Sequence, residues 1–163
     1  MNILVCIKQV TDTTEIKIDP VKHTLIREGV PSIVNPFDAC ALEMAVRLKE
    51  KEGGKVIVIS MGPAQAKNAL KECLAVGADQ AFLVTDRAFG GSDTLATSYI
   101  LSRAIAAVEA KTGEKFDLIF CGKQAIDGDT AQVGPEIAEH MDLPHVTLAT
   151  AVEMADGKLH VTR

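Results

Sequence analysis

The chain has 163 residues, of which 47% are hydrophobic, and its 17 Lys and Arg residues against 22 Asp and Glu give a formal net charge of −5. This length is typical of one domain, the apolar content excludes intrinsic disorder, and the acidic balance argues against binding to nucleic acid. No apolar run approaches the roughly 20 residues that span a bilayer, and the N-terminal residues lack a basic leader. We therefore expect a soluble, cytoplasmic protein without membrane insertion.

Short apolar runs recur along the chain and alternate with helical patterns. They lie at Ile3–Ile7, Lys55–Ser60, Ala81–Val84 and Leu118–Cys121, with a weaker run near Val146–Ala149. The inner runs are continuous rather than alternating, which is typical of strands covered on both faces. Because the segments between them are long enough for crossover helices, we expect an α/β fold with a doubly wound, mostly parallel, five-stranded sheet.

Three segments between these strands carry the end signals of helices. Asn35 and Pro36 predict an N-cap followed by the first helical residue, and Gly62-Pro63 predict the start of a second helix that ends at Gly77. A third helix is expected after Ser92, a candidate N-cap. Apolar spacing predicts the buried stripe of the second helix, which consists of Ala66, Ala69, Leu70, Cys73 and Leu74.

Two stretches depart from the alternation of strand and helix. Residues Glu15–Ile26 alternate in hydrophobicity around Asp19-Pro20, which predicts an excursion hairpin after the first strand. Residues Val152–Thr162 are divided by Asp156-Gly157, a strong signal for a hairpin turn. The chain ends at Arg163, within the second arm of that hairpin, so we expect a truncated chain or one completed by a partner.

The four cysteines are scattered, without a CxxC pair or the Cys and His spacing of a zinc site. Cys6 and Cys121 lie in strand-like runs, and Cys40 and Cys73 lie in helix-like runs. We expect all four to be buried, reduced thiols, and we expect no metal site. Dinucleotide fingerprints, phosphate-loop motifs and hydrolase motifs are also missing, so no residue is predicted to be catalytic.

The longest loop follows the fourth strand, at the carboxyl edge of the predicted sheet, where open α/β sheets bind ligands. It runs from Gly122 to Pro135 and contains three glycines, which let the backbone approach a phosphate closely. Asp127 and Asp129 are expected to accept hydrogen bonds from a ribose or from the backbone. The alternative is a solvated connector, but long loops in compact domains are often functional. The next helix is expected to begin at Pro135.

A second turn rich in glycine and hydroxyl groups, Gly90–Thr97, follows the third strand. Thr94 and Thr97 are three residues apart, so their hydroxyls can face the same direction. The pair suits a phosphate or the edge of a flavin, although an N-cap role for Ser92 accounts for much of the turn.

Six segments in the same order resemble the β subunit of electron-transfer flavoproteins. They are Val5–Asp12, Asn35–Asp38, Met61–Ala64, Leu74–Asp79, Gly91–Thr97 and Gly122–Pro135. The last of them, with GKQAIDGDT, is the most specific. The resemblance implies an adenine nucleotide α-hydrolase-like fold. It also implies that family members continue past Arg163, so that residues 1–163 form a single nucleotide-binding domain without the family's C-terminal segment.

The resemblance further implies an electron carrier rather than an enzyme. Such a β subunit pairs with an α subunit as a heterodimer and holds AMP or FAD in its own crevice. In flavin-bifurcating members the second FAD takes a hydride from NADH, in complex with partners. The carrier would take electrons from a dehydrogenase and pass them to an acceptor. The implied dehydrogenase is an acyl-CoA dehydrogenase, as in fatty acid oxidation, or a similar redox partner.

The resemblance also implies which residues hold the nucleotide. Asp93, Thr94 and Thr97 would approach the phosphates on the flavin side. The other implied contacts are Cys6, Asn35, Pro36, Phe37, Asp38, Met61, Gly122, Lys123, Gln124, Ala125, Ile126, Asp127, Gly128, Asp129, Thr130, Ala131, Gln132 and Val133.

Two other functions share the predicted architecture. One is a stand-alone ATP- or AMP-binding module of the universal-stress-protein type, which would retain ATP without an α subunit. The other is an adenylating enzyme, which would need a pyrophosphate loop after the first strand. Lys8–Asp12 stands there instead.

Overall fold

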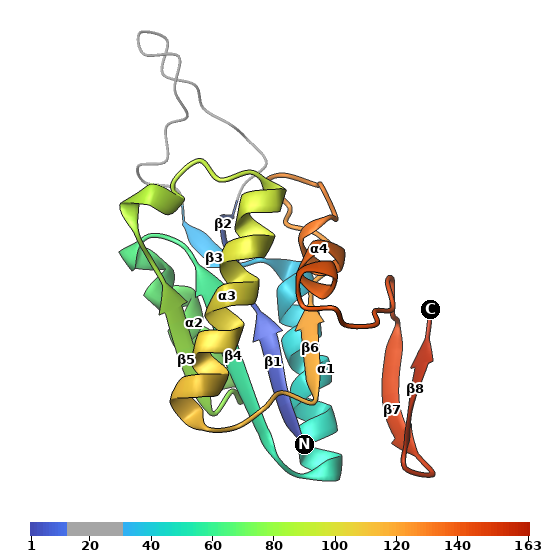
Figure 1. Cartoon of the computed structure of the whole chain (residues 1–163). Coiled ribbons are helices and arrows are strands. Elements are labelled where there is room, and N and C mark those ends of the chain that lie inside the picture. The colour runs from blue at the N-terminus through green and yellow to red at the C-terminus, as the bar shows by residue number, and fades with distance from the viewer. Residues whose placement is uncertain (13–30) are drawn as a thin grey trace, which may run out of the picture.

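The computed structural model describes residues 1–12 and 31–163, and the hairpin predicted at Glu15–Ile26 lies outside them (Figure 1). The centre of the fold is a parallel sheet in the order β5-β4-β1-β6. These strands are β1 (Asn2–Cys6), β4 (Lys55–Met61), β5 (Gln80–Val84) and β6 (Leu118–Cys121). All four agree with the apolar runs predicted as strands.

Helices cover both faces of this sheet, as the doubly wound prediction requires. Figure 1 shows α3 (Thr94–Thr112) in front of the sheet and α1 (Pro36–Glu52) behind it. The helix α2 (Lys67–Val76) lies on the face of α1, and α4 (Val133–His140) lies on the face of α3. Two short 3-10 helices, η1 (Ala64–Ala66) and η2 (Arg87–Phe89), follow β4 and β5.

The core has two layers because successive side chains of a strand point to opposite faces. In β1, Ile3 and Val5 pack with residues of α1 and α2, whereas Leu4 and Cys6 pack with residues of α3 and α4. These four side chains are buried, and full burial of a Val, Leu or Ile side chain contributes about 2 kcal/mol to folding. The double burial explains why the strand sequence is continuously apolar.

The predicted fifth strand is wrong. Among the described residues, Val146–Ala149 is not a strand and does not pair with β6. Leu148 has a φ of 58°, which interrupts an extended backbone. Val146 and Leu148 are exposed, so β-branched and apolar character in this segment does not produce a buried strand.

The predicted C-terminal hairpin is confirmed. Its strands are β7 (Ala151–Ala155) and β8 (Lys158–Thr162), paired antiparallel. Asp156 and Gly157 have φ values of 51° and 70°, and positive φ at both central residues is the mark of a type I′ turn. Two further short strands, β2 (Gln9–Thr11) and β3 (Ser32–Val34), pair antiparallel beside the central sheet.

Several details at the helices differ from the predictions. Leu74 is 41% exposed, so it does not belong to the buried stripe of α2, and Cys40 is exposed on α1. Asp93 rather than Ser92 caps α3, with its carboxylate accepting the Ala96 amide at 2.8 Å. The α4 helix begins at Val133 and not at Pro135, because a proline in the first turn replaces an amide that has no helical partner.

No helix in the described parts of the chain has the length and apolar content needed to cross a bilayer.

Candidate functional site

A cleft of about 610 Å³ lies beyond the carboxyl ends of β1, β4 and β6. In Figure 1 the loop after β6 and the N-terminal end of α3 both lie above the sheet at this edge. The strand order reverses here, since the chain runs from β1 out to β5 and then returns to place β6 on the other side of β1. A crevice at such a switch point is the usual ligand site of an open α/β sheet.

Most of the predicted site residues line this cleft. Its floor is formed by Cys6, Met61 and Cys121, at the ends of three strands. The lining residues that were predicted are Cys6, Asp38, Met61, Asp93, Thr94, Thr97, Gly122, Lys123, Gln124, Ala125, Gly128, Thr130, Ala131, Gln132 and Val133.

The remaining predicted residues do not line the cleft. These are Asn35, Pro36, Phe37, Ile126, Asp127 and Asp129. Lining residues that the site prediction omitted are Ile7, Lys8, Phe89, Gly91, Ser92, Leu101, Cys121 and Gly134. Lys8 could have been found, because it follows the first strand directly, at the edge where ligands bind.

Asn35 is fully buried and joins three segments that surround the cleft. Its Nδ2 donates to the carbonyl oxygen of Gln124 at 2.8 Å, and its Oδ1 accepts the Ile126 amide at 3.1 Å. Its backbone amide donates to the carbonyl oxygen of Lys8 at 2.9 Å. Asn35 does precede α1 as predicted, but its side chain does not cap the helix. It holds the loop after β6 instead.

Asp38 lies in the first turn of α1 and contacts the segments after β1 and β6, at Lys8 and Gly122. Its Oδ2 accepts the Lys8 amide at 2.7 Å. Burial raises the pKa of Asp38 to about 6, because hydrogen bonds from the Lys8 amide, the Asn35 side chain and the Gly122 amide offset the desolvation only in part. This carboxylate therefore costs stability when it is ionised, and it stays within reach of the cleft.

Gly122 is required by the packing of α1 against β6. A Cβ at this position would lie 2.6 Å from the carbonyl carbon of Phe37 and 2.7 Å from the amide nitrogen of Asp38. A Cβ at Gly128 would meet no protein atom within 4 Å. Gly122 thus permits the close approach of two backbones, whereas Gly128 leaves open space in the lining of the cleft.

The loop between β6 and α4 has an uncommon backbone. Asp129 and Ala131 have φ values of 52° and 54°, a left-handed conformation that costs a non-glycine residue roughly 1–2 kcal/mol. Strain of this kind concentrates at ligand sites. Thr130, between the two, lines the cleft.

Two lysines supply positive charge to the lining of the cleft. Lys8 Nζ lies 2.7 Å from Asp127 Oδ1, and both side chains are partly exposed. Lys123 Nζ lies 5.9 Å from the centroid of the Phe37 ring, within range of a cation–π contact. Lysine ammonium groups and free backbone amides are groups that bind phosphate oxygens.

The Cys6 thiol at the floor is not a nucleophile. Cys6 and Cys121 occupy matching positions of the paired strands β1 and β6. Hydrogen bonding to Cys121 and burial raise the pKa of the Cys6 thiol well above its ordinary value. Cys6 therefore stays protonated at neutral pH, and only a thiolate is nucleophilic.

The first turn of α3 contributes Thr94 and Thr97 to the lining of the cleft. The Asp93 carboxylate accepts a hydrogen bond from the Ala96 amide, as described above. Thr94 Oγ1 donates to Glu136 Oε1 at 3.1 Å, and this bond joins the first turn of α3 to the first turn of α4.

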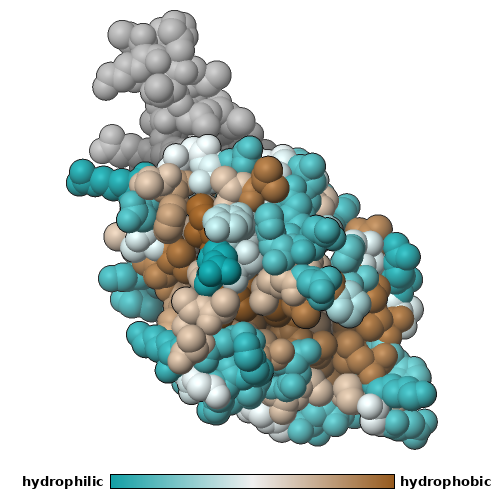
Figure 2. Space-filling model, viewed as in Figure 1, coloured by the Kyte–Doolittle hydropathy of each residue, from teal (hydrophilic) through white to brown (hydrophobic). Residues whose placement is uncertain are grey.

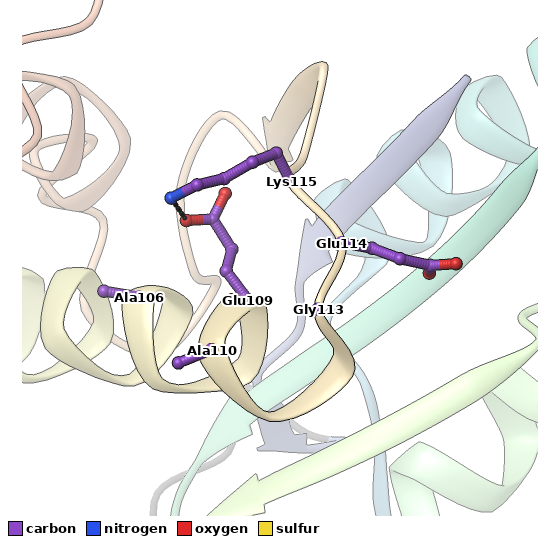
Figure 3. A pocket seen from close by; sticks show the side chains of 6 residues that line it. All are labelled: Ala106, Glu109, Ala110, Gly113, Glu114 and Lys115. Atoms are coloured by element: carbon purple, nitrogen blue, oxygen red, sulfur yellow. Dashed lines mark hydrogen bonds and ion pairs between the residues drawn. The ribbon is translucent and has the colours of Figure 1, made fainter.

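A second depression, of about 200 Å³, lies at the opposite end of α3 (Figure 3). There Lys115 Nζ lies 2.7 Å from Glu109 Oε2, while Glu114 points away from them. Burial raises the pKa of Glu109, but hydrogen bonds from Lys115 and the Phe116 amide outweigh it and leave the pKa below its ordinary value. These contacts join the end of α3 to the start of β6, and we assign the depression a structural role. Within residues 1–12 and 31–163, no group of three metal-ligating side chains occurs.

Comparison with known proteins gives one family. The family described as "Electron transfer flavoprotein domain" matches residues 22–163. The chain is 62% identical to an electron transfer flavoprotein subunit beta of Thermoanaerobacterium thermosaccharolyticum, over the whole chain and 60% of that relative. It is 56% identical to the caffeyl-CoA reductase-Etf complex subunit CarD of Acetobacterium woodii, again over the whole chain and 61% of that relative.

A third relative is protein FixA of Azotobacter vinelandii, which is 52% identical over the whole chain and 58% of its own length. The chain thus spans about three fifths of the length of these relatives.

Proposed function

The chain belongs to the electron transfer flavoprotein family, and from this premise we propose that it is the nucleotide-binding part of a β subunit that carries electrons. The observation that carries the proposal is the cleft at the switch point of the sheet. Its lining combines the backbone of the loop after β6, two lysines and hydrogen-bonding side chains, and its Cys6 thiol stays protonated. Such a lining binds and orients a cofactor, which then supplies the chemistry.

The proposed cofactor is FAD or AMP. The loop from Gly122 to Gly134, with Lys8 and Lys123, would hold phosphate, and the open space at Gly128 leaves room for a ligand. A volume of about 610 Å³ lies within the roughly 300–1,000 Å³ of sites that enclose ligands of drug size. Because the cleft also extends to the N-terminus of α3, the larger FAD is favoured. A bound flavin would supply one- and two-electron transfer, and the chain would orient it and exclude water.

The proposed partners are an electron-transfer flavoprotein α subunit, in a heterodimer, and a dehydrogenase that acts on acyl-CoA or a similar substrate. The relative named as a subunit of a caffeyl-CoA reductase-Etf complex supports a partner of this chemistry. Figure 2 shows apolar residues gathered around a hollow near the centre of one face, and several large apolar side chains, including Tyr99 and Leu143, are exposed. Flavin bifurcation with NADH is proposed only for the assembled complex.

The test is to purify the protein under mild conditions, record its absorbance spectrum, and release and identify its nucleotide. We expect FAD or AMP near one per chain. Gly128→Val serves as the cleft variant, because a Cβ at this position would meet no protein atom within 4 Å. We expect it to lower nucleotide occupancy while the thermal stability is preserved. Retention of ATP without flavin would favour the universal-stress-protein alternative, and occupancy unchanged by Gly128→Val would remove the cleft from the proposal.

A further inference from the structure

The strand β6 forms an open edge of the central sheet. Among the residues that the structure describes, it pairs only with β1. The Asp117 amide donates to the carbonyl oxygen of Asn2 at 2.9 Å, so alternate residues from Asp117 onward direct their backbone groups to β1. The amides and carbonyls of Leu118 and Phe120 therefore point away from β1, and no backbone group of the described residues bonds to them on that side.

The side chains of β6 are also incompletely covered. All four residues of the strand are apolar and only partly buried, namely Leu118, Ile119, Phe120 and Cys121. Leu118 and Phe120 belong to the core layer of α1, whereas Ile119 and Cys121 belong to the layer of α3. In β1, by contrast, Leu4 is fully buried. Because parallel strands are normally covered on both faces, β6 has the composition of an inner strand in the position of an edge strand.

The opposite edge of the sheet carries a protection that β6 lacks. Natural edge strands are kept from pairing by charged side chains, especially lysine. At the β5 edge, Lys111 Nζ lies 6.0 Å from the centroid of the Phe82 ring. The strand β6 itself contains neither a charged residue nor a proline. An apolar edge without such protection is a site at which a further strand can pair.

The C-terminal hairpin indicates where such a strand comes from. Figure 1 shows β7 and β8 beside β6, on the side away from β1. Val152 and Met154 of β7 pack against the same core layer as Leu118 and Phe120, so the hairpin and the open edge share one apolar surface. The hairpin leads directly to Arg163, and about two fifths of the length of the relatives lies outside the part that this chain matches.

We propose that the open edge of β6 pairs with an apolar strand from the part of the β subunit that follows Arg163 in full-length family members. Pairing would satisfy the outward amides of Leu118 and Phe120 and make β6 an inner strand. The added strand needs apolar side chains on both faces, because β6 presents apolar side chains to both core layers. This inference rests on membership of the family and goes beyond nucleotide binding, since it concerns the sheet edge and not the cleft.

Hydrogen exchange of single amides tests the proposal, because it distinguishes the two sides of β6. In the chain of 163 residues, we expect the Ile119 amide, which is directed to β1, to exchange slowly and the Phe120 amide to exchange fast. The second protein is the full-length electron transfer flavoprotein subunit beta of Thermoanaerobacterium thermosaccharolyticum, without its α subunit. There the amide that corresponds to Phe120 should exchange at least about a hundredfold more slowly.

Phe82 is the matched control, on the opposite edge of the sheet. The Asp79 amide donates to the carbonyl oxygen of Val56, so by the same alternation the Phe82 amide points away from β4. It should exchange equally fast in both proteins. Equal exchange at Phe120 in the two proteins would overturn the proposal. Protection that depends on the concentration of the chain of 163 residues would do so too, because it would identify a second copy as the occupant.

Cross-linking within the complex of the same relative identifies the occupant directly. A photoreactive phenylalanine analogue at the position that corresponds to Phe120 should form a cross-link within its own chain, beyond the position of Arg163. A cross-link to the α subunit, or to a second copy, would contradict the proposal. Neither experiment depends on a bound nucleotide, so a protein that binds neither FAD nor AMP would refute the proposed function and leave this inference to be decided by the sheet edge alone.

Discussion

The side chain of Asn35 and the backbone of Gln124 are joined by a hydrogen bond of 2.8 Å across 89 residues of sequence. The same buried side chain accepts the Ile126 amide at 3.1 Å. Asn35 thereby fixes the start of the loop after β6 without lining the cleft itself. Its role is to hold the backbone of this loop in place at the edge of the cleft.

Asn35→Ala should destabilise the protein by about 2–4 kcal/mol, because it truncates a fully buried side chain and leaves the part-buried Gln124 carbonyl and Ile126 amide without its hydrogen bonds. Urea unfolding measures this change. Asn35→Asp is the informative companion, since its carboxyl retains an acceptor for Ile126 and offers a donor to Gln124 only when it is protonated. We expect its loss to be about half as large at a pH where the carboxyl is neutral. A stability of Asn35→Ala within about 0.5 kcal/mol of the parent would contradict this role.

The buried carboxyl of Asp38 should make stability depend on pH in an uncommon direction. Burial raises its pKa from 3.8 to about 6, so the folded state binds a proton more tightly than the unfolded state. The contribution of Asp38 to stability is therefore greatest below about pH 4 and decreases as the pH rises through 6. A shift from 3.8 to about 6 corresponds to about 3 kcal/mol.

Asp38→Asn isolates this contribution, because asparagine does not titrate. We expect the stability of the parent relative to Asp38→Asn to fall by about 3 kcal/mol between about pH 4 and about pH 7. Denaturant unfolding at several pH values provides the measurement. A difference that stays constant, or that rises with pH, would show that Asp38 does not titrate as its burial implies.

Two glycines of the same loop should respond in opposite ways to alanine. Gly122→Ala would place a Cβ within 2.7 Å of the backbone of α1, so we expect a loss of at least about 2 kcal/mol and a disturbed helix start. Gly128→Ala meets no protein atom and removes freedom from the unfolded chain, so stability should rise by up to about 1 kcal/mol. Thermal unfolding of both variants tests the contrast. Equal destabilisation would mean that the loop packs differently from the structure.

The strands that sequence reasoning identified correctly are those buried on both faces. Val5 and Val58 are fully buried members of continuous apolar runs, and such runs have few alternative structures. The segment Val146–Ala149 is also apolar, but composition does not reveal whether a segment pairs with the edge strand of the sheet, here β6. Leu148 instead turns to a positive φ, and the segment leaves the sheet.

The cleft was predictable because ligand sites of parallel sheets follow the carboxyl ends of their strands. That rule predicts Met61 and Lys123 in the lining from the sequence alone, because they lie at or just after the carboxyl ends of β4 and β6. It cannot separate a residue that contacts the ligand from one that positions it. Asn35 was predicted as a contact, but its partners lie far along the chain, and only the folded structure brings them together.

The ion pair between Lys8 and Asp127 should compete with phosphate binding. The two side chains are 49% and 40% exposed, so the pair itself contributes at most about 1 kcal/mol to stability. Asp127→Asn would release the ammonium group of Lys8 and remove a negative charge beside the cleft. We expect nucleotide affinity to rise about threefold at low salt and the gain to shrink as the ionic strength increases.

Lys8→Met should act in the opposite direction, because it removes a cation from the lining and keeps the length of the side chain. Glu43→Gln is the matched control, since Glu43 also forms an exposed ion pair, with Arg47 at 2.6 Å, but lies outside the cleft. Its effect on affinity should be negligible at every salt concentration. If Asp127→Asn and Lys8→Met both weakened nucleotide binding, the ion pair would be a structural support of the loop rather than a competitor of the phosphate, and the loop would have to be rigid before it could bind.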